Sequence, residues 1–191
     1  MKNTDISNTG GLAAREKKGS LWQFLPQNNG AFLSPDAEYI SRLYFPLMNV
    51  YGMKSYVTPD LKGDIVSAFQ HFLTAATGTE ELHRNVSGRN FWIAIEGKKP
   101  WSVAGNSVFQ KAEKWTTNHD KSEVEGHLGA FILRRRNQQY GIEAVTTIFV
   151  PNTDDFVELM KISVTNISDK PISFKSYSAT AIFGRHADNF R

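Results

Sequence analysis

The sequence predicts an all-β fold built from antiparallel strands, and two observations carry this prediction. Between Tyr140 and Phe183, apolar and polar residues alternate with the two-residue period of half-buried strands. From Leu21 onward, proline and glycine recur at intervals that leave room only for short strands and loops. Together these patterns favour a β-sandwich, in which one face of each strand lies against a shared core.

The segment from Tyr140 to Phe183 is typical of three consecutive antiparallel strands with turns between them. In the first strand the core-facing residues fall at even positions: Tyr140, Ile142, Ala144, Ile148 and Val150. In the second strand they are Met160, Ile162 and Val164. In the third strand they change parity, from Ile172 and Phe174 to Tyr177, Ala179, Ala181 and Phe183. One extra residue near Lys175 and Ser176 would explain the change, so we predict a β-bulge there.

The expected domain organisation is a loose leader over residues 1–20 and one β-sandwich domain over residues 21–191. The leader has almost no large apolar side chains, so ordering it would bury too little surface to offset the lost backbone entropy. The sequence stops at FGRHADNFR, directly after a strong apolar strand pattern. We therefore expect the sandwich to be incomplete and the chain to be a fragment of a longer protein.

Residues 63–84 fit a helix about as well as a pair of strands. The local pattern leans towards a helix, on the apolar positions Ile65, Val66, Phe69, Phe72 and Leu73. Thr79 precedes two glutamates and predicts a short capped helical turn. Further on, residues 89–97 predict a strand, residues 98–100 a turn, and residues 101–110 a continuation of the strand.

Composition excludes several classes of protein. The 191 residues carry 22 Lys and Arg against 19 Asp and Glu, a net charge of +3 without any basic block, so nothing indicates nucleic-acid binding. There is no cysteine, which excludes disulfides, thiolate metal sites and a cysteine nucleophile. No stretch approaches the roughly 20 apolar residues of a membrane span, and the N-terminus lacks the apolar core of a signal peptide. We predict a cytoplasmic protein without membrane partners.

The sequence contains no motif of an autonomous active site. It lacks the G-x-S-x-G elbow, the P-loop, H-E-x-x-H and a G-x-G-x-x-G turn. The five histidines are scattered without metal-ligand spacing, so no metal is predicted. The acidic pairs Asp154–Asp155 and Glu80–Glu81 are sequence neighbours, which point to opposite faces of a strand and cannot flank one glycosidic bond. We therefore predict no catalytic residue and no cofactor in this chain.

Tryptophans and arginines between residues 84 and 140 allow two interpretations. The set comprises Trp92, Trp101, Trp115, Phe91, Tyr140, Arg84, Arg89, Arg134, Arg135 and Arg136. Sugar rings stack on flat apolar faces while cationic donors bond their hydroxyls, so these residues suit a carbohydrate surface. The alternative is that the aromatic rings belong to the core or to a contact between domains. Successive arginines on a strand alternate faces, so Arg134–Arg136 cannot form one patch.

Several segments taken together resemble the N-terminal domain of the phosphorylases of glycoside hydrolase family 94. This family includes cellobiose and chitobiose phosphorylases, 1,2-β-oligoglucan phosphorylases and cyclic β-1,2-glucan synthase modules. The similarity covers most of residues 32–191. It rests on LYFPLMNVYGMKSYVTPDLKGDI, SGRNFWIAIEGKKPWSVAG, the long run from GHLGAFILRRRNQQYGI to DKPISF, and FGRHADNFR. The forms VTPDLKGD and RNFWIAIEGKKPWS resemble the members that act on β-1,2-glucans more closely than cellobiose phosphorylases.

The resemblance implies a galactose-mutarotase-like super-sandwich, followed in the whole protein by a helical linker and a catalytic (α/α)6 barrel. It also implies that the segment SAFQHFLTAAT is a strand. The family reaction is inverting cleavage of a β-linked glucan by inorganic phosphate, which gives a sugar 1-phosphate. Phosphate is already anionic at neutral pH and attacks without a general base, so one carboxylic acid suffices. The resemblance places that acid in the barrel, outside this chain.

The resemblance implies a scaffold role for this chain, with a β-glucan oligosaccharide, the protein's own barrel and a second copy in a homodimer as partners. Arg134 occupies the place of an arginine near the acceptor sugar, and Trp92 and Trp101 are the further candidate substrate contacts. Two rivals remain. One is a free-standing carbohydrate-binding module, which requires its tryptophans exposed on one face. The other is a mutarotase-like enzyme, which requires a histidine and a carboxylate converging in a cleft.

Overall fold

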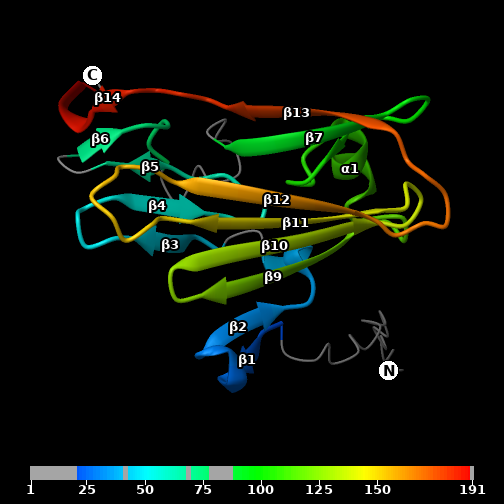
Figure 1. Ribbon diagram of the computed structural model, residues 1–191, viewed down its shortest axis with the longest axis horizontal. Coiled ribbons are helices and arrows are strands. Elements are labelled where there is room, and N and C mark those ends of the chain that lie inside the picture. Colours follow the sequence, from blue (N-terminus) through cyan, green and yellow to red (C-terminus); the bar gives the residue numbers. More distant parts are fainter. Residues whose placement is uncertain (1–20, 41–42, 68–69, 78–87, 190–191) are drawn as a thin grey trace, which may run out of the picture.

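The computed structural model of the chain describes residues 21–40, 43–67, 70–77 and 88–189. Within these residues strands predominate, and they form three antiparallel sheets (Figure 1). The predicted antiparallel all-β sandwich is therefore confirmed. The predicted leader and the predicted helical turn at Thr79 lie outside the described residues.

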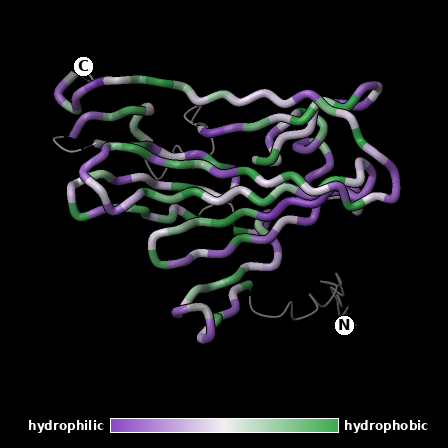
Figure 2. The backbone as a smooth tube through the Cα atoms, in the orientation of Figure 1, coloured by the Kyte–Doolittle hydropathy of each residue, from purple (hydrophilic) through white to green (hydrophobic). Residues whose placement is uncertain are grey.

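The large sheet has six strands in the order β1-β2-β9-β10-β11-β12. Its strands are β1 (Gln23–Leu25), β2 (Ala31–Ser34), β9 (Lys121–His127), β10 (Ala130–Asn137), β11 (Ile142–Phe149) and β12 (Leu159–Asn166). Hydrophobic and hydrophilic stretches alternate along them (Figure 2). Burial follows the same period, because Ile142, Ala144 and Ile148 are buried while Thr147 and Phe149 are partly exposed. The predicted inward faces of the first two strands are thus confirmed.

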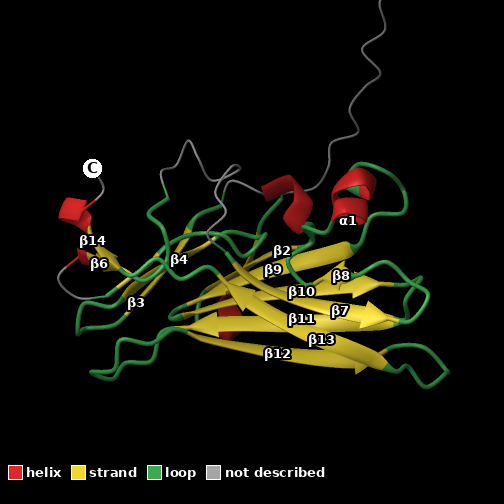
Figure 3. Ribbon diagram, turned by 90° about the horizontal axis from the view of Figure 1, so that it is seen from above, coloured by secondary structure: helices red, strands yellow, loops and turns green. Residues whose placement is uncertain are grey.

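The small sheet has three strands in the order β13-β7-β8. They are β7 (Arg89–Ile95), β8 (Trp101–Ser102) and β13 (Phe174–Thr180). Figure 3 shows these strands running alongside β10, β11 and β12 of the large sheet. Ile93 and Trp101 of the small sheet and Phe131 and Leu133 of β10 are all fully buried in one core cluster. The two sheets are therefore the two layers of the sandwich.

The side sheet has five strands in the order β14-β6-β5-β4-β3. They are β3 (Phe45–Met48), β4 (Lys54–Val57), β5 (Ile65–Val66), β6 (His71–Phe72) and β14 (Arg185–His186). Its apolar residues join the same core, and the rings of Phe45 and Phe131 lie 5.7 Å apart. The local pattern that leaned towards a helix is therefore wrong for β5 and β6, because core burial outweighs a weak local preference. Of the strand that the resemblance implies for SAFQHFLTAAT, the described residues form only the two-residue strand β6.

Helices are few and short among the described residues. They are the helix α1 (Val108–Glu113) and the 3-10 turns η1 (Pro26–Asn28), η2 (Ala37–Ile40) and η4 (Ala187–Asn189). The predicted strand over residues 101–110 is correct only for β8, because the chain turns at Gly105 and enters α1. Gly105 has φ +70°, and a Cβ there would lie 2.4 Å from the Arg135 guanidinium. The turn therefore requires glycine, which ends the strand.

The third strand of the Tyr140–Phe183 segment differs from its prediction in two ways. β13 leaves the large sheet and pairs with β7, so it does not follow β12 as a neighbour. Its ladder with β7 is continuous from Phe174 opposite Ile95 to Thr180 opposite Arg89, which means that the predicted β-bulge is absent. All seven residues of this edge strand are exposed, including Phe174. Since no face is buried, no alternation is enforced, and the change of parity had no structural meaning.

Candidate functional site

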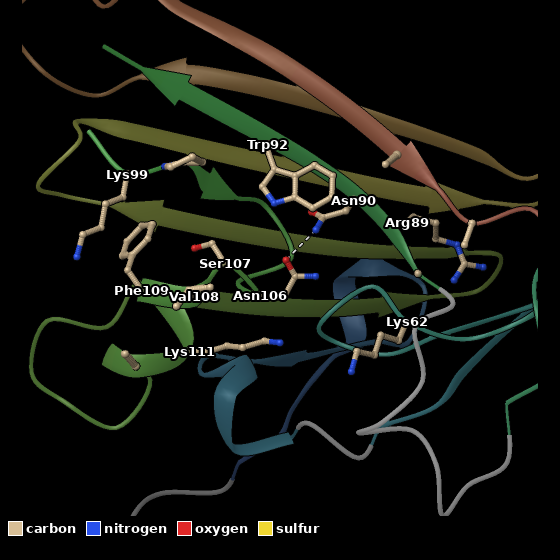
Figure 4. A pocket seen from close by; sticks show the side chains of 15 residues that line it. Lys62, Arg89, Asn90, Trp92, Lys99, Asn106, Ser107, Val108, Phe109 and Lys111 are labelled. Carbon is tan, nitrogen blue, oxygen red and sulfur yellow. Dashed lines mark hydrogen bonds between the residues drawn. The ribbon is translucent and has the colours of Figure 1, made fainter. Parts of the chain in front are cut away.

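A pocket of about 970 Å³ lies between the small sheet and α1. We call it the sheet–helix pocket (Figure 4). β7 contributes Asn90 and Trp92, the turn before α1 contributes Asn106 and Ser107, and α1 contributes Phe109 and Lys111. Ala179 and Ala181, at the end of β13 and beyond it, form part of the wall.

The sheet–helix pocket lies where small side chains occur on the outer face of the small sheet. The register places Ala179 of β13 opposite Asn90, and Tyr177 opposite Trp92. Ser102 of β8 lies opposite Trp92 on the other side. Alanine beside Asn90 and serine beside Trp92 leave room for a cavity between the sheet and α1, and the half-buried ring of Trp92 forms part of its wall.

Two asparagines are held in place at the base of the pocket. Asn106 Oδ1 accepts hydrogen bonds from Asn90 Nδ2 at 2.7 Å and from Ser102 Oγ at 2.8 Å. Asn90 is only 6% exposed, and its Oδ1 accepts from the backbone N–H of Phe91 at 2.8 Å. The oxygen of Asn106 is thus occupied, and its Nδ2 remains as a donor to a ligand in the pocket.

Among the described residues that line the pocket, the charged side chains are cationic, namely Lys62, Arg89, Lys99 and Lys111. Arg89 is neutralised, because Glu158 lies 2.5 Å from its Nε and both side chains are almost fully buried. The other charged residues of the described lining are the three lysines, and Asp60 lies 3.5 Å from the Lys62 ammonium. A pocket with amide and ammonium donors suits binding of oxygen-rich ligands.

A buried polar network anchors α1 beside the pocket. Gln110 of α1 donates to Asp120 Oδ2 at 2.6 Å, and its Oε1 accepts from the backbone N–H of Ser102 at 2.9 Å. Asp120 also accepts from Trp101 Nε1 at 2.8 Å and from Asn137 Nδ2 at 2.8 Å. This network ties α1 to both layers of the sandwich.

The structure separates the three tryptophans of the predicted carbohydrate surface. Trp92 lines the pocket. Trp101 is fully buried with its Nε1 satisfied by Asp120, which is a correction to its prediction as a substrate contact. Its apolar ring fills the space between the two layers. Trp115, at 68% exposure, follows α1 and packs against Tyr39, with ring centroids 5.8 Å apart. They form no common flat face.

Arg134 lies on the outer face of the large sheet, remote from the sheet–helix pocket in the fold. Its Nη1 donates to Glu143 Oε1 at 3.0 Å, and Glu123 lies 3.6 Å from its Nε. Arg136 shares this face and donates to Glu143, whereas Arg135 points into the core, so the predicted alternation of the arginines is confirmed. Burial raises the pKa of Glu143, but hydrogen bonds and charge from Arg136 and then Arg134 outweigh burial and lower it overall.

Among the other predicted features, the structure brings two histidines together. His71 of β6 pairs with His186 of β14, and their rings lie 4.8 Å apart. In the part of the chain that the structure describes, no three His, Asp or Glu side chains are grouped to hold a metal ion. None of its helices has the length and apolar character needed to cross a membrane. Arg84, Glu80 and Glu81 lie outside the described residues.

Comparison with models of known protein families gave no match for this sequence, and neither did comparison with curated proteins. The chemistry of the pocket therefore has to be inferred from its own residues. Sequence reasoning identified Trp92 but missed Asn90, Asn106 and Lys111. The two-residue period of β7 places Asn90 and Trp92 on one face, a signal that was available. The position of α1 over that face could not be predicted from the sequence.

Proposed function

We propose that this chain is the N-terminal sandwich domain of an inverting glycoside phosphorylase that cleaves a β-linked glucan with inorganic phosphate. In this role it is a carbohydrate-contacting scaffold for a catalytic barrel, and alone it is inactive. Its partners would be a glucan oligosaccharide, the barrel of the same protein and a second copy. The family is proposed on the sequence segments that resemble its N-terminal domain.

The observation that carries the scaffold role is a pocket in which an aromatic ring lies beside hydrogen-bond donors. It combines the ring of Trp92 with the amide of Asn106, and the lining residues that the structure describes include no carboxylate. Buried carboxylates elsewhere in the described residues are already engaged: Glu158 binds Arg89, and Asp120 binds Trp101 and Gln110. In the proposed phosphorylase the acid belongs to the catalytic barrel, as the resemblance implies.

The test is an assay of a longer protein that contains this chain. We expect release of sugar 1-phosphate from β-1,2- or β-1,4-linked oligosaccharides only when inorganic phosphate is present, and no turnover by the 191-residue chain alone. Hydrolysis without phosphate, or turnover by the chain itself, would contradict the proposal. Arg134→Ala in the longer protein tests the acceptor contact, since unchanged KM for the acceptor would remove Arg134 from the site.

A second candidate function is a carbohydrate-binding module that acts without catalysis. The exposed ring of Trp115 is the observation that favours it, because the residue is 68% exposed and exposed indole rings stack on sugars. Affinity electrophoresis of the chain in soluble β-glucans distinguishes the two. Retardation that disappears in Trp115→Ala supports the module, and retardation that persists in that variant argues against it.

A further inference from the structure

Two histidines that are far apart in the sequence lie in contact at one end of the side sheet. β14 pairs with β6 in antiparallel register, which places His186 directly opposite His71 (Figure 1). Their ring centroids lie 4.8 Å apart, with 70° between the ring planes. His71 is exposed and His186 is half-buried, so solvent reaches the pair. Two neighbouring imidazoles that solvent reaches can each offer a ring nitrogen to one metal ion.

The separation of the two rings matches shared coordination of one ion. Two imidazoles that bind an ion through nitrogens at about 2.0–2.1 Å, with about 90–110° between the bonds, have ring centroids about 4.5–5.2 Å apart. The observed 4.8 Å lies within this range. The contact is edge to face, so coordination requires the exposed His71 ring to turn about its Cβ–Cγ bond, a torsion with broad minima. That bond points at the ring centre, so the turn hardly changes the separation.

Asp188 occupies one nitrogen of His186 and orients its ring. Both the carboxylate Oδ2 and the backbone nitrogen of Asp188 lie 3.2 Å from His186 Nδ1. These contacts leave Nε2 as the nitrogen that is available to a metal. The Asp188 carboxylate can accept the Nδ1 proton of the tautomer that a metal at Nε2 requires, as carboxylates do behind many metal-binding histidines.

We propose that His71 and His186 form a two-histidine site for a divalent late transition-metal ion, with water at the remaining positions. Imidazole nitrogen is a preferred ligand of Zn²⁺, Cu²⁺ and Ni²⁺, whereas Mg²⁺ and Ca²⁺ prefer oxygen. With two protein ligands the site binds more weakly than structural zinc sites, which have four. The inference is independent of the proposed function, because it involves neither a sugar nor phosphate.

A bound ion would fasten residues 183–189 to the side sheet. The ladder between β14 and β6 consists of His186 opposite His71 and Arg185 opposite Phe72. The backbone N–H of Phe183 also donates to the carbonyl of Leu73 at 2.8 Å. Separated strands would offer the ion single histidines only. Metal binding therefore favours the paired arrangement by mass action.

Isothermal titration of the 191-residue chain with Zn²⁺, Cu²⁺, Ni²⁺ and Mg²⁺ tests the proposal. We expect Cu²⁺ to bind most tightly, as the order of divalent-metal affinities requires, and Mg²⁺ not to bind. His71→Ala and His186→Ala should each weaken Cu²⁺ binding at least about tenfold, because losing even an orienting partner of a metal ligand costs that much. A chain that binds no Cu²⁺, or variants that bind it as the unmodified chain does, would overturn the proposal.

Two other histidines of the chain provide matched controls. His127 Nε2 lies 2.9 Å from Glu125, which pairs a histidine with a carboxylate instead of a second histidine. His119 Nδ1 lies 2.6 Å from the carbonyl of Thr116. His127→Ala and His119→Ala should change Cu²⁺ affinity less than about twofold, because distant substitutions act independently. If either control weakens binding as much as His71→Ala, the metal binds elsewhere and the proposal is wrong.

Thermal melting provides a second readout and checks folding. His71 is exposed, so His71→Ala should melt like the unmodified chain in the presence of EDTA. Excess Zn²⁺ should raise the melting temperature of the unmodified chain by a few degrees and leave that of His71→Ala unchanged. An equal rise in both would show that the ion does not need the histidine pair, which would contradict the site.

Asp188→Asn tests the positioning role of the carboxylate. This variant keeps both histidines and should weaken Cu²⁺ binding less than His186→Ala does. If Asp188→Asn leaves the affinity unchanged, Asp188 has no part in the site, and binding then rests on the two histidines alone.

Discussion

Two pairs of arginines in this protein show how differently the same side chain behaves in the core and on a sheet surface. The side chains of Arg89 and Arg135 are 2% and 4% exposed, while those of Arg134 and Arg136 are 38% and 42% exposed. All four bind carboxylates. The buried pair, however, has lost water that the exposed pair keeps, so its partners must replace the lost hydrogen bonds.

Arg89 shows how complete that replacement is. It donates to Glu158 through two nitrogens, to Ser55 Oγ at 2.9 Å and to the carbonyl of Gly63 at 3.2 Å. Ser55 also donates to Glu158, which closes the network. Arg89 belongs to the small sheet and Ser55 to the side sheet, and Glu158 immediately precedes β12 of the large sheet. A single ion pair thus joins all three sheets, whereas the exposed arginines join neighbouring strands of one sheet.

The largest expected effect follows from removing Arg89. Arg89→Ala leaves the carboxylate of Glu158, whose side chain is 5% exposed, without its partner, and should lower the free energy of unfolding by about 3–5 kcal/mol. Urea unfolding at pH 7 measures the loss. The double variant Arg89→Met with Glu158→Leu removes both charges and should regain most of it. If Arg89→Ala costs less than about 1 kcal/mol, the buried arginines contribute no more to stability than the exposed ones.

A smaller loss is expected for Arg135. Its Nε donates to the carbonyl of Val103 at 3.1 Å and its Nη1 to Glu38 at 3.0 Å. Arg135→Ala should cost about 2–3 kcal/mol, because Glu38 keeps the Lys114 ammonium and some solvent contact. The control is Glu38→Gln, which keeps a hydrogen-bond acceptor for Arg135 and should cost less. If Glu38→Gln lowers the free energy of unfolding more than Arg135→Ala does, the charge of Glu38 contributes more to stability than the buried Arg135 side chain.

A pH series compares one carboxylate from each environment. Burial raises the pKa of Glu38, but Arg135 and Lys114 outweigh it, and the pKa of Glu143 is lowered by Arg136 and Arg134 in the same way. Because both folded-state pKa values lie below the unfolded value of about 4.3, this stabilisation is present above that pH and is lost as pH falls further. The urea concentration at the midpoint of unfolding should therefore decrease as the pH is lowered from about 5 to about 3. Glu38→Gln with Glu143→Gln should flatten the fall, and an unchanged slope would contradict it.

The smallest expected effect belongs to Arg136. Its guanidinium contacts Glu143 at 2.9 Å through Nε, but Arg134 contacts the same carboxylate and both arginines are partly hydrated. Arg136→Ala should therefore change the free energy of unfolding by less than about 1 kcal/mol, with a loss that shrinks in 0.5 M salt. Urea unfolding at low and high salt measures it. A salt-independent loss as large as that of Arg89→Ala would show that exposure is a poor guide to the role of these arginines.

The alternation of arginine faces could be predicted from the sequence, but the partners could not. Consecutive residues of a strand point to opposite sides, so Arg135 had to differ from Arg134 and Arg136. Glu38, Glu143 and Glu158 lie far away or on other strands, and only the folded chain brings them to these arginines. The same holds for the pocket. Trp92 was a candidate from its residue type, while Lys62 and Lys111 come from separate segments that only the fold brings to the pocket.

The predicted bulge in β13 marks the limit of pattern reasoning. Apolar alternation predicts a buried face only when another layer covers the strand, and no described residue covers β13 sufficiently to bury any of its positions. β11, with the same kind of pattern, lies between β10 and β12 in the large sheet and alternates in burial from Ala144 to Phe149.

By itself the amino-acid sequence determined the fold class, the inward faces of β11 and β12 and the strand character of β7, because local alternation and turn residues encode these features directly. Only the tertiary structure decided that β13 joins β7, that Trp101 is a core residue, and that lysines from three segments line one pocket. The physical reason is that strand pairing and burial are long-range events. They depend on which surfaces meet, and no local sequence pattern states that.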